Sequence, residues 1–478
     1  MQKNLLLIIL LFVAIATKAQ PVVLGGMTSA GGSNGLGTVF QIKGDGTGFQ
    51  SMLSFGSSTG TNPVGDLTLV SNSIIYGMTK NGGAYNSGAI FILDATINDT
   101  YLDIFDFNDT LGANPYGSLI QASNGLLYGM TDSGGLYNRG VIFSVDPLMV
   151  NYSVIYNLND STGKYPKGSL FQASNGQLYG MTSYGGKFNY GTIFKFDPIL
   201  DTVTVLYNFT FTSGIDPQGN LMQAANGKLY GMTQFGGLNN SGTIFSIDTS
   251  GNNFTKLHDF VASTSSGNTT GALPTGTLLQ DSATQKLYGM ASFGGSTSQN
   301  GVIFTLDTAN HYVDILNFSN TNGQFPQGSF IKASDGKFYG TTFAGGTLGE
   351  GVIFKIDPSS NNAYTKLHDF VLTDGANPYG NLIELPQGTG MQNIQSSDEM
   401  SIYPNPAPGK FNFKANFSSS KTLEIIVSDN IGETIYKSPI ISPLNEVFTI
   451  DLSTKAKGIY FVMFKTDNHV EIKKLILN

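Results

Sequence analysis

Residues Leu229–Asp248 read LYGMTQFGGLNNSGTIFSID, and this wording recurs along most of the chain. Its fixed parts are a Leu-Tyr-Gly-Met-Thr segment, a Gly-Gly pair and a Gly-Thr-Ile-Phe segment that is followed by an aspartate. The glycine after the tyrosine marks each copy and recurs every 51 or 52 residues, with one step of 58: Gly26 in a degenerate first copy, then Gly77, Gly129, Gly180, Gly231, Gly289 and Gly340. Repeats of about this length indicate a solenoid, a propeller or another array.

Each copy contains four short strand candidates. In the copy around Gly231 they are residues 220–224, 228–233, 242–248 and 254–260. Asn226-Gly227 separates the first two, which is a strong hairpin signal. The candidates are almost continuously apolar, as in sheets that are covered on both faces. Four such strands in about 50 residues predict the blade of a β-propeller.

A second marker is a Pro-x-Gly that precedes a first strand. It also occurs seven times, at Pro63, Pro115, Pro166, Pro217, Pro274, Pro326 and Pro378. The repeats nevertheless begin at a second strand, residues 23–28, and end with a lone first strand, residues 380–385. If this last strand completes the first blade, the ring closes and no sheet edge is left open at the junction. We therefore predict an all-β, seven-bladed propeller, with an open solenoid as the alternative.

The repeat also resembles two known families. Its strand order, with a Gly-Gly after the second strand, is similar to the kelch repeat without the kelch tryptophan. The combination Tyr-Gly-Met-Thr, Gly-Gly and Gly-Thr-Ile-Phe resembles the bacterial GloVer tandem repeat over about residues 21–387. That resemblance implies a propeller and implies no particular activity.

The composition changes after the repeats. Residues 388–398 are polar and lack a strand pattern, as in a linker. Short alternating strands over residues 399–478 predict a small β-sandwich, which as an alternative could be an ordinary ligand-binding module. This region resembles the type A sorting domain of type IX secretion cargo, on the motif residues Tyr403, Pro404, Asn405, Pro406, the Asp429–Gly432 turn, Gly458, Tyr460, Lys474 and Leu475. The resemblance implies export through the outer membrane of a diderm bacterium by the type IX machinery, followed by release or attachment to the cell surface.

The N-terminus has the features of a secretory signal peptide. Lys3 precedes an apolar run over residues 5–16, and Thr17-Lys18-Ala19 fits a small-x-small cleavage site. We expect cleavage between Ala19 and Gln20. The apolar run is too short to span a bilayer, and no other segment is long enough. The expected organisation is a signal peptide (1–19), a propeller (20–387), a linker (388–398) and a sorting domain (399–478).

Composition excludes several classes of function. The net charge of −8 argues against a nucleic-acid partner, because no basic stripe is available to neutralise phosphates. The absence of cysteine excludes disulfides, thiolate metal sites and a cysteine nucleophile. The four histidines lack metal-ligand spacing, and His258 and His368 occupy equivalent repeat positions, as scaffold residues do. No catalytic motif with convincing spacing is present, and we expect no metal and no cofactor.

The best candidate for a functional surface is the face that carries the Gly-Gly loops. In a propeller, these loops share one face with the connections between blades, and in this chain both are long and variable. Aromatic side chains beside polar neighbours suit contact with a sugar or a peptide. The predicted ligand-binding residues are Tyr85, Tyr137, Arg139, Tyr184, Phe188, Tyr190, Phe235, Phe293 and Phe343. The alternative is that these aromatic residues simply pack between blades.

These observations favour a secreted or cell-surface, non-enzymatic binding protein for a polysaccharide or another surface partner. One alternative is a carbohydrate-active hydrolase or lyase, which would need carboxylates facing one cleft. The aspartates that end the third strands recur in most copies and are typical of turns, so the candidates are the less repetitive Asp132, Glu350 and Asp374. Another alternative is a structural or adhesive matrix protein.

Overall fold

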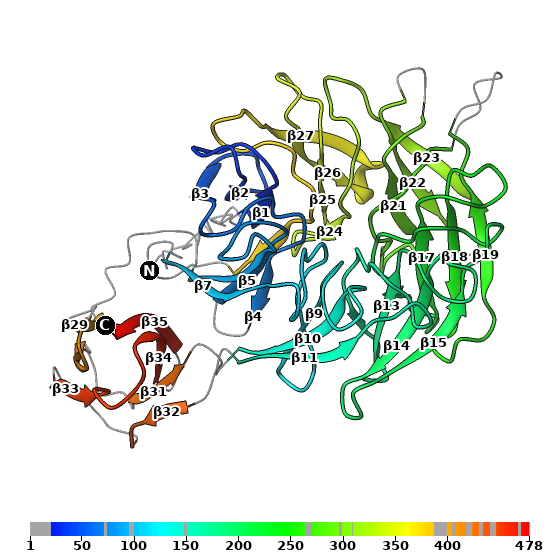
Figure 1. Ribbon diagram of the computed structural model, residues 1–478. Coiled ribbons are helices and arrows are strands. Elements are labelled where there is room, and N and C mark those ends of the chain that lie inside the picture. Colours follow the sequence, from blue (N-terminus) through cyan, green and yellow to red (C-terminus); the bar gives the residue numbers. More distant parts are fainter. Residues whose placement is uncertain are drawn as a thin grey trace, which may run out of the picture.

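The computed structural model describes residues 21–70, 74–94, 100–147, 151–262, 270–295, 299–307, 309–386, 399–403, 407–416, 423–429, 434–439, 446–466 and 470–477. The predicted signal peptide with Ala19 and Gln20, the linker and Pro404–Pro406 lie outside these residues. The described part is all-β apart from one 3-10 turn, Pro358–Ser360. Seven four-stranded antiparallel sheets form a ring, and two smaller sheets follow at the C-terminus (Figure 1).

The seven sheets are blades I to VII, and the strands of each blade are named from the innermost to the outermost. Blade I holds β28 (Ile383–Leu385), β1 (Val23–Thr28), β2 (Thr38–Lys43) and β3 (Gln50–Ser54). Blade II holds β4 (Thr68–Val70), β5 (Ile74–Thr79), β6 (Ala89–Asp94) and β7 (Thr100–Asp106). Blade III holds β8 (Ile120–Gln121), β9 (Leu127–Met130), β10 (Val141–Asp146) and β11 (Asn151–Asn157). Blade IV holds β12 (Phe171–Gln172), β13 (Leu178–Thr182), β14 (Thr192–Asp197) and β15 (Thr202–Asn208).

The remaining blades follow the same order. Blade V holds β16 (Met222–Gln223), β17 (Leu229–Thr233), β18 (Thr243–Ile247) and β19 (Thr255–Asp259). Blade VI holds β20 (Leu279–Gln280), β21 (Leu287–Ala291), β22 (Val302–Leu306) and β23 (Tyr312–Asn317). Blade VII holds β24 (Ile331–Lys332), β25 (Phe338–Thr342), β26 (Val352–Asp357) and β27 (Ala363–Asp369). The seven-bladed propeller with four strands per blade is therefore confirmed.

The ring closes inside blade I, as the phase of the repeats predicted. The last propeller strand, β28, pairs antiparallel with the first strand, β1, through Val23–Leu385, Leu24–Glu384 and Gly25–Ile383. Blade I thus takes its innermost strand from the end of the repeat region and its other three strands from the beginning. In Figure 1 the blue beginning and the yellow end of the repeat region meet at this point.

Two close contacts explain why the same residue types recur at fixed positions of the repeat. In blade V, Gly231 of β17 pairs with Phe245 of β18, and a Cβ on Gly231 would lie only 2.6 Å from the Phe245 ring. The glycine therefore leaves room for the phenylalanine, which is fully buried between blades. Gly242 has a positive φ of 99°, and a Cβ there would lie 2.8 Å from Pro274 of the next blade. The glycine of the Gly-Thr-Ile-Phe segment therefore leaves room for the proline of the Pro-x-Gly segment in the following blade.

The outer strands are joined by stacked rings. Phe105 of blade II stacks on Tyr152 of blade III at 3.8 Å, and Tyr207 of blade IV stacks on Phe254 at 3.8 Å. His258 occupies the same register position in blade V and stacks on Tyr312 at 4.0 Å. His368 of blade VII completes the pattern against Phe49 at 3.8 Å. Both histidines thus act as flat packing surfaces, in agreement with their predicted scaffold role.

Around the axis, the glycines of the seven Pro-x-Gly segments form a closed ring, which we call the glycine ring. A Cβ on any of them would lie 2.0–2.8 Å from the carbonyl oxygen of the next one, in the order Gly65, Gly117, Gly168, Gly219, Gly276, Gly328, Gly380 and back to Gly65. Such distances are far below van der Waals contact, so every member must be glycine for the blades to approach each other this closely.

The residues that follow these glycines form a second closed ring, the polar ring. The backbone N–H of each member donates to the side-chain oxygen of the member in the next blade. The bonds run Asp66 to Ser118 (2.6 Å), Ser118 to Ser169 (2.7 Å), Ser169 to Asn220 (2.5 Å), Asn220 to Thr277 (2.9 Å), Thr277 to Ser329 (2.6 Å), Ser329 to Asn381, and Asn381 to Asp66 (2.6 Å). Each of the seven backbone N–H groups of the polar ring therefore has an acceptor in the next blade. Buried backbone donors need such partners, because water cannot supply them. Burial raises the pKa of the one carboxyl in the ring, Asp66, although these hydrogen bonds oppose the shift.

The C-terminal region forms a small sandwich. One sheet holds β29 (Glu399–Tyr403), β30 (Lys410–Asn416) and β33 (Glu446–Asp451), and the other holds β32 (Thr434–Lys437), β31 (Leu423–Asp429), β34 (Gly458–Thr466) and β35 (Val470–Leu477). Their facing side chains, among them Phe411, Phe413, Val427 and Phe464, form its own apolar core. Of the motif residues, Tyr403 ends β29 and is exposed, Gly458 begins β34, Tyr460 and Leu475 are buried, and Lys474 lies in β35.

Candidate functional site

The Gly-Gly loops and the connections between blades lie on one face of the propeller, which we call the loop face. Short bridges join the two kinds of segment, for example Thr61–Asn81, Lys164–Tyr184 and Ile215–Phe235. The other face carries the tight turns between the first and second strands and between the third and fourth strands. The two sets of variable segments therefore form one continuous surface, as expected from the sequence.

The residue in front of each Pro-x-Gly has a left-handed backbone. Its φ lies between 53° and 57° in all seven copies: Asn62, Asn114, Tyr165, Asp216, Leu273, Phe325 and Asn377. This conformation is uncommon for residues other than glycine and asparagine, and it costs about 1 kcal/mol or more at Leu273 or Phe325. The sharp turn and the fixed φ of proline deliver the middle residue of the tripeptide to the axis.

These seven middle residues surround the mouth of the axial channel on the loop face. We call them the funnel: Val64, Tyr116, Lys167, Gln218, Thr275, Gln327 and Tyr379. Although the proline and glycine on either side are the same in every copy, the funnel contains five residue types. Its members also differ in kind around the ring. Tyr379, Val64 and Tyr116 come from adjacent blades I to III and form an aromatic and apolar half, whereas the members from blades IV to VII are polar.

Residues of the Gly-Gly loops support the funnel from outside. Lys80 Nζ donates to Tyr116 Oη at 2.6 Å and lies 4.3 Å from the centre of the Tyr116 ring. Phe343 packs edge-to-face with Tyr379 at 6.3 Å. In the polar half, Gln218 Nε2 donates to Gln234 Oε1. Two flat rings beside a set of amide and hydroxyl groups can receive a ligand that has an apolar face and a polar edge.

Asp216 is the most deeply buried charged group beside the funnel, with 4% of its surface exposed. Its Oδ2 accepts a hydrogen bond from Gln218 Nε2 at 3.0 Å. Its Oδ1 has no hydrogen-bond partner, because Lys167 Nζ lies 3.8 Å away, beyond hydrogen-bond distance. An unpaired buried oxygen of this kind costs about 1–3 kcal/mol unless a further donor reaches it.

Other ionisable groups at the mouth reflect the same burial. The pKa of Asp132 is raised by burial, against the opposing charges of Lys167 and Lys80, and Asp216 raises it further. Burial raises the pKa of Tyr379 to about 12, with smaller contributions from Tyr116 and Asp216. Two lysines and two aspartates thus share the region between blades II and V, and their charges balance.

The funnel narrows to a neck at the glycine and polar rings. The cavity enclosed by the funnel and these two rings measures about 50 Å³, which is room for a few water molecules. Below the neck the channel widens to about 360 Å³ between the innermost strands, with an apolar lining that includes Ile120, Phe171 and Met222. The cavity on the loop-face side is therefore the smaller of the two.

The nine residues predicted to bind a ligand all lie on the loop face but not at one point. Tyr85, Tyr137 and Phe188 are exposed at the tips of the Gly-Gly loops. Four others lie nearer the axis: Tyr184, Phe235, Phe293 and Phe343. Tyr184 packs edge-to-face with Tyr165 at 6.4 Å, and Phe293 packs against Phe325 at 4.9 Å. Tyr190 is partly buried in the apolar cluster between blades IV and V, so the structure gives it a packing role.

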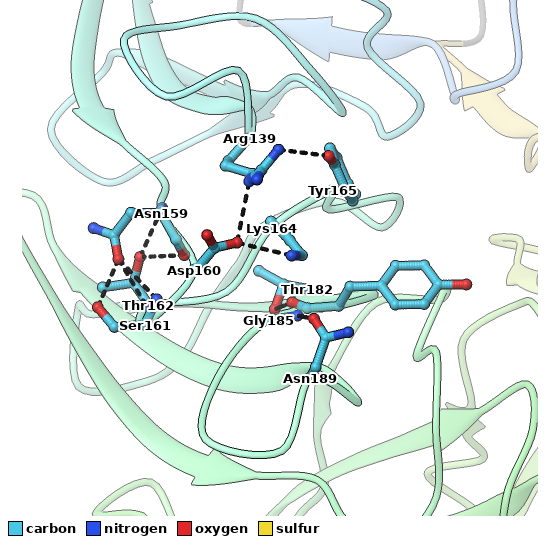
Figure 2. A network of polar contacts seen from close by, with 11 residues as sticks. Arg139, Asn159, Asp160, Ser161, Thr162, Lys164, Tyr165, Thr182, Gly185 and Asn189 are labelled. Carbon is cyan, nitrogen blue, oxygen red and sulfur yellow. Dashed lines mark hydrogen bonds and ion pairs between the residues drawn. The ribbon is translucent and has the colours of Figure 1, made fainter.

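Arg139 belongs to a polar network at the junction of blades III and IV (Figure 2). Its Nε lies 3.1 Å from Asp160 Oδ1, and its Nη1 donates to Tyr165 Oη at 2.9 Å. Lys164 Nζ contacts the same Asp160 oxygen at 2.8 Å. The hydrogen bonds from Lys164 and Arg139 hold the pKa of Asp160 below its usual value. The guanidinium group has five N–H donors, and these two contacts use two of them, so three remain for a ligand. The protein therefore fixes the position of Arg139 and leaves part of its hydrogen-bonding capacity open.

The three acids considered for catalysis do not come together. Asp132 lies at the mouth of the funnel, as its coupling to Lys167 and Asp216 shows. Asp374 accepts from the backbone of Val371 at 2.9 Å and contacts His368 Nε2 at 3.2 Å, on the outer side of blade VII. Glu350 lies in the Gly-Gly loop of blade VII. Among the described residues, no three His, Asp or Glu side chains form a group that could hold a metal ion. The described chain also contains no apolar helix of membrane-crossing length.

The funnel residues were not predicted from the sequence, although a signal for them was present. Pro-x-Gly served only as a marker of the repeat, because its proline and glycine recur. The middle position of the tripeptide varies between copies while its neighbours do not, from Val64 to Tyr116 to Lys167. In a closed ring of repeats, a variable residue between two invariant ones indicates a position that is fixed in space and free in chemistry.

Solved structures share this fold at low sequence identity. A candidate 6-phosphogluconolactonase from Bacteroides fragilis aligns with a TM-score of 0.50 and 14% identity, over 77% of this chain and 98% of that one. Another candidate 6-phosphogluconolactonase, from Bacteroides uniformis, aligns with a TM-score of 0.51 and 13% identity, over 77% of this chain and 99% of that one. At such identities the similarity shows the fold alone. No curated protein matches the sequence.

Two family models match the chain. The model of the Gloeobacter/Verrucomicrobia repeat matches residues 23–175, 98–280 and 171–393, which together cover the whole propeller. The model of the secretion system C-terminal sorting domain matches residues 401–478, which form the sandwich. A type IX sorting domain directs its protein to the cell surface or the exterior. The chain therefore belongs to the Gloeobacter/Verrucomicrobia repeat family and carries a C-terminal sorting domain for export.

Proposed function

We propose that this protein is a non-enzymatic binding protein of the cell surface or the surroundings, and that it holds a polysaccharide or another surface partner at its funnel. The observation that carries the proposal is the variability of the funnel between two invariant neighbours. Seven copies of one turn bring seven side chains to the axis, and these side chains differ in character between a proline and a glycine that do not change. The rest of each turn maintains the contact between blades and leaves the middle residue free for recognition.

The chemistry of the mouth supports a sugar-containing ligand. The rings of Tyr116 and Tyr379 offer flat apolar area. On the opposite side, Gln327 and Lys167 offer donors and Gln218 offers its amide oxygen. A sugar ring has an apolar face and hydroxyl groups at its edge, so it can contact both halves. The small volume of the cavity at the funnel, about 50 Å³, favours a chain end or a side branch over a strand threaded through the channel.

The proposed setting is the outside of a diderm bacterium. The signal peptide (1–19), with cleavage between Ala19 and Gln20, would take the chain across the inner membrane, and the sorting domain would take it through the outer membrane. The domain limits at 387, 388–398 and 399 are part of this proposal. Release of the propeller and its attachment to the outer surface are both compatible with it.

The test is to incubate the full chain with a panel of polysaccharides and surface extracts and to follow both retention and product release. We expect retention without product, and retention should fall about fivefold for Gln327→Ala, which removes an amide from the polar half of the funnel. Gln50→Ala is the matched control, because Gln50 is exposed on the outermost strand of blade I, away from the funnel. Absence of retention on every material would contradict the proposal, and self-association without a ligand would favour the structural or adhesive alternative.

The enzymatic alternative has one observation in its favour. Asp132 and Asp216 lie near Lys167 at one side of the funnel, and the raised pKa of Asp132 is of the kind seen at general acids. A carbohydrate hydrolase or lyase that used them would release oligosaccharides in the same incubation. Asp132→Asn would then abolish product release and leave retention in place.

A further inference from the structure

The outer edge of blade II breaks the sevenfold pattern at one position. In the third and fourth strands of the other six blades, the corresponding cross-strand pairs contain at least one polar residue: Gln41–Gln50, Ser144–Ser153, Lys195–Thr204, Ser246–Thr255, Thr305–Val313 and Lys355–Thr365. In blade II the pair is Ile92–Leu102, which is apolar on both strands. The sequence therefore provides an apolar patch on one blade only.

The fourth-strand member of this pair is also buried in blade II only. Leu102 is 7% exposed, whereas its counterpart in blade VI, Val313, is 51% exposed. Gln50, Thr204, Thr255 and Thr365 are exposed as well. Two strand positions further along β7, Ile104 is buried, while its counterparts Leu206 and Leu257 are only partly buried. Something covers the outer strand of blade II that does not cover the other blades.

The covering side chain comes from the sorting domain. Phe461 of β34 is 6% exposed and belongs to the same apolar cluster as Ile92, Leu102 and Ile104. Its neighbours along the strand, Tyr460 and Val462, point the other way, into the core of the sorting domain itself. Phe461 therefore lies on the outer face of its sheet, and Figure 1 shows the sorting domain beside the propeller, on the side of blades II and III.

We propose that the outer edge of blade II is a docking surface for the sorting domain of the same chain, with Phe461 as the anchor and Ile92–Leu102 as its seat. One aromatic anchor is enough while the two parts are joined, because a short tether keeps the local concentration near the millimolar range. The surface lies toward the end of β6 that is remote from the Gly-Gly loops. Docking therefore leaves the loop face and its funnel free, so export and ligand binding use separate surfaces.

The full chain offers a clean optical test because it contains no tryptophan. Phe461→Trp introduces a single reporter, and we expect blue-shifted emission and poor quenching by iodide in the folded protein. Adding Ile92→Ser and Leu102→Ser copies the Ser144–Ser153 pair of blade III, so the blade should still fold. In that variant the emission should shift to the red and the quenching constant should rise severalfold. Val313→Ser in blade VI is the matched control and should change neither value.

A second measurement avoids the tryptophan. Hydrogen exchange of the β7 amides should become faster in the Phe461→Ser chain than in the unmodified chain, while the amides of β23 in blade VI keep their rates. The proposal is overturned if the reporter is already exposed in the folded chain. It is equally overturned if Ile92→Ser with Leu102→Ser leaves the emission of the tryptophan at position 461 unchanged. The same holds if Phe461→Ser does not change the hydrogen-exchange rates of the β7 amides. Loss of polysaccharide retention would bear on the funnel and not on this surface.

Discussion

The glycine ring and the funnel are adjacent in sequence and opposite in behaviour. Each Pro-x-Gly places its glycine against the carbonyl of the next blade, and the residue before it at the mouth of the channel. The glycine is the same in all seven copies, because a Cβ has no room there. The funnel residue changes from valine to tyrosine to lysine, because its side chain lies at the mouth of the channel and not in the contact between the backbones of neighbouring blades. Repetition in this chain thus marks contact between blades, and variation at the axis marks a surface available for function.

The largest effect is expected where the ring has least room. A Cβ on Gly219 would lie 2.0 Å from the carbonyl oxygen of Gly276. Gly219→Ala should therefore force two blades apart and lower the free energy of unfolding by about 3 kcal/mol or more. A urea titration measures this change. Gly25→Ala is the control, since its Cβ would meet only the Leu385 side chain at an ordinary 3.4 Å. Equal costs for the two variants would show that the ring is not a special contact.

The polar ring should be the next most sensitive region. Ser169→Ala removes the acceptor for the buried N–H of Ser118, now at 2.7 Å. An orphaned buried donor should lower the free energy of unfolding by about 2 kcal/mol. Ser169→Thr should restore most of this loss, because Thr277 performs the same task in another blade. If the alanine and threonine variants unfold alike in urea, the hydrogen bond contributes less than the shape of the side chain.

The same contrast explains what could be predicted from the sequence. The blades and their closure followed from Asn-Gly turns, apolar strands and seven Pro-x-Gly markers, because local signals repeated many times reinforce each other. The funnel was missed because Tyr116 or Lys167 follows no pattern of its own. The partner of Arg139, Asp160, lies in the next connection, and only the folded ring brings them together. Phe461 reads as an ordinary strand residue until its neighbour in space is known.

The stacked side chains that join the outer strands should make the free energy of unfolding depend on pH, because two of them are histidines. Burial lowers the pKa of His258 from 6.5 to about 4, while Asp259 opposes the shift. The folded state therefore binds this proton less readily than the unfolded chain. The neutral His258 side chain therefore costs the folded state nothing above pH 6.5. As the pH falls from 6.5 toward 4, the free energy of unfolding decreases, and the decrease is about 1 kcal/mol at pH 5.5. His258→Tyr, which copies Tyr207 of blade IV, should flatten the fall in urea midpoint between pH 7.5 and 5.5. An unchanged slope would assign the acid sensitivity to other groups, such as His368, whose pKa is also lowered by burial.

The smallest effect on stability, and the most informative, is expected in the funnel. Tyr116→Val with Tyr379→Val gives blades III and I the residue that blade II already carries, Val64. The contacts of the glycine and polar rings are kept, and only the side-chain contacts with Lys80 and Phe343 are lost. The urea midpoint should correspond to a change within about 1 kcal/mol of the parent protein. Retention on the polysaccharide identified in the panel should nevertheless fall, because the flat half of the mouth is gone. Tyr85→Val, at an exposed loop tip, is the control for a general loss of surface aromatic area. If the double variant were as unstable as Gly219→Ala, the two tyrosines would be packing residues. The contrast between the glycine ring, which stabilises the fold, and the funnel, which is available for binding, would then be wrong.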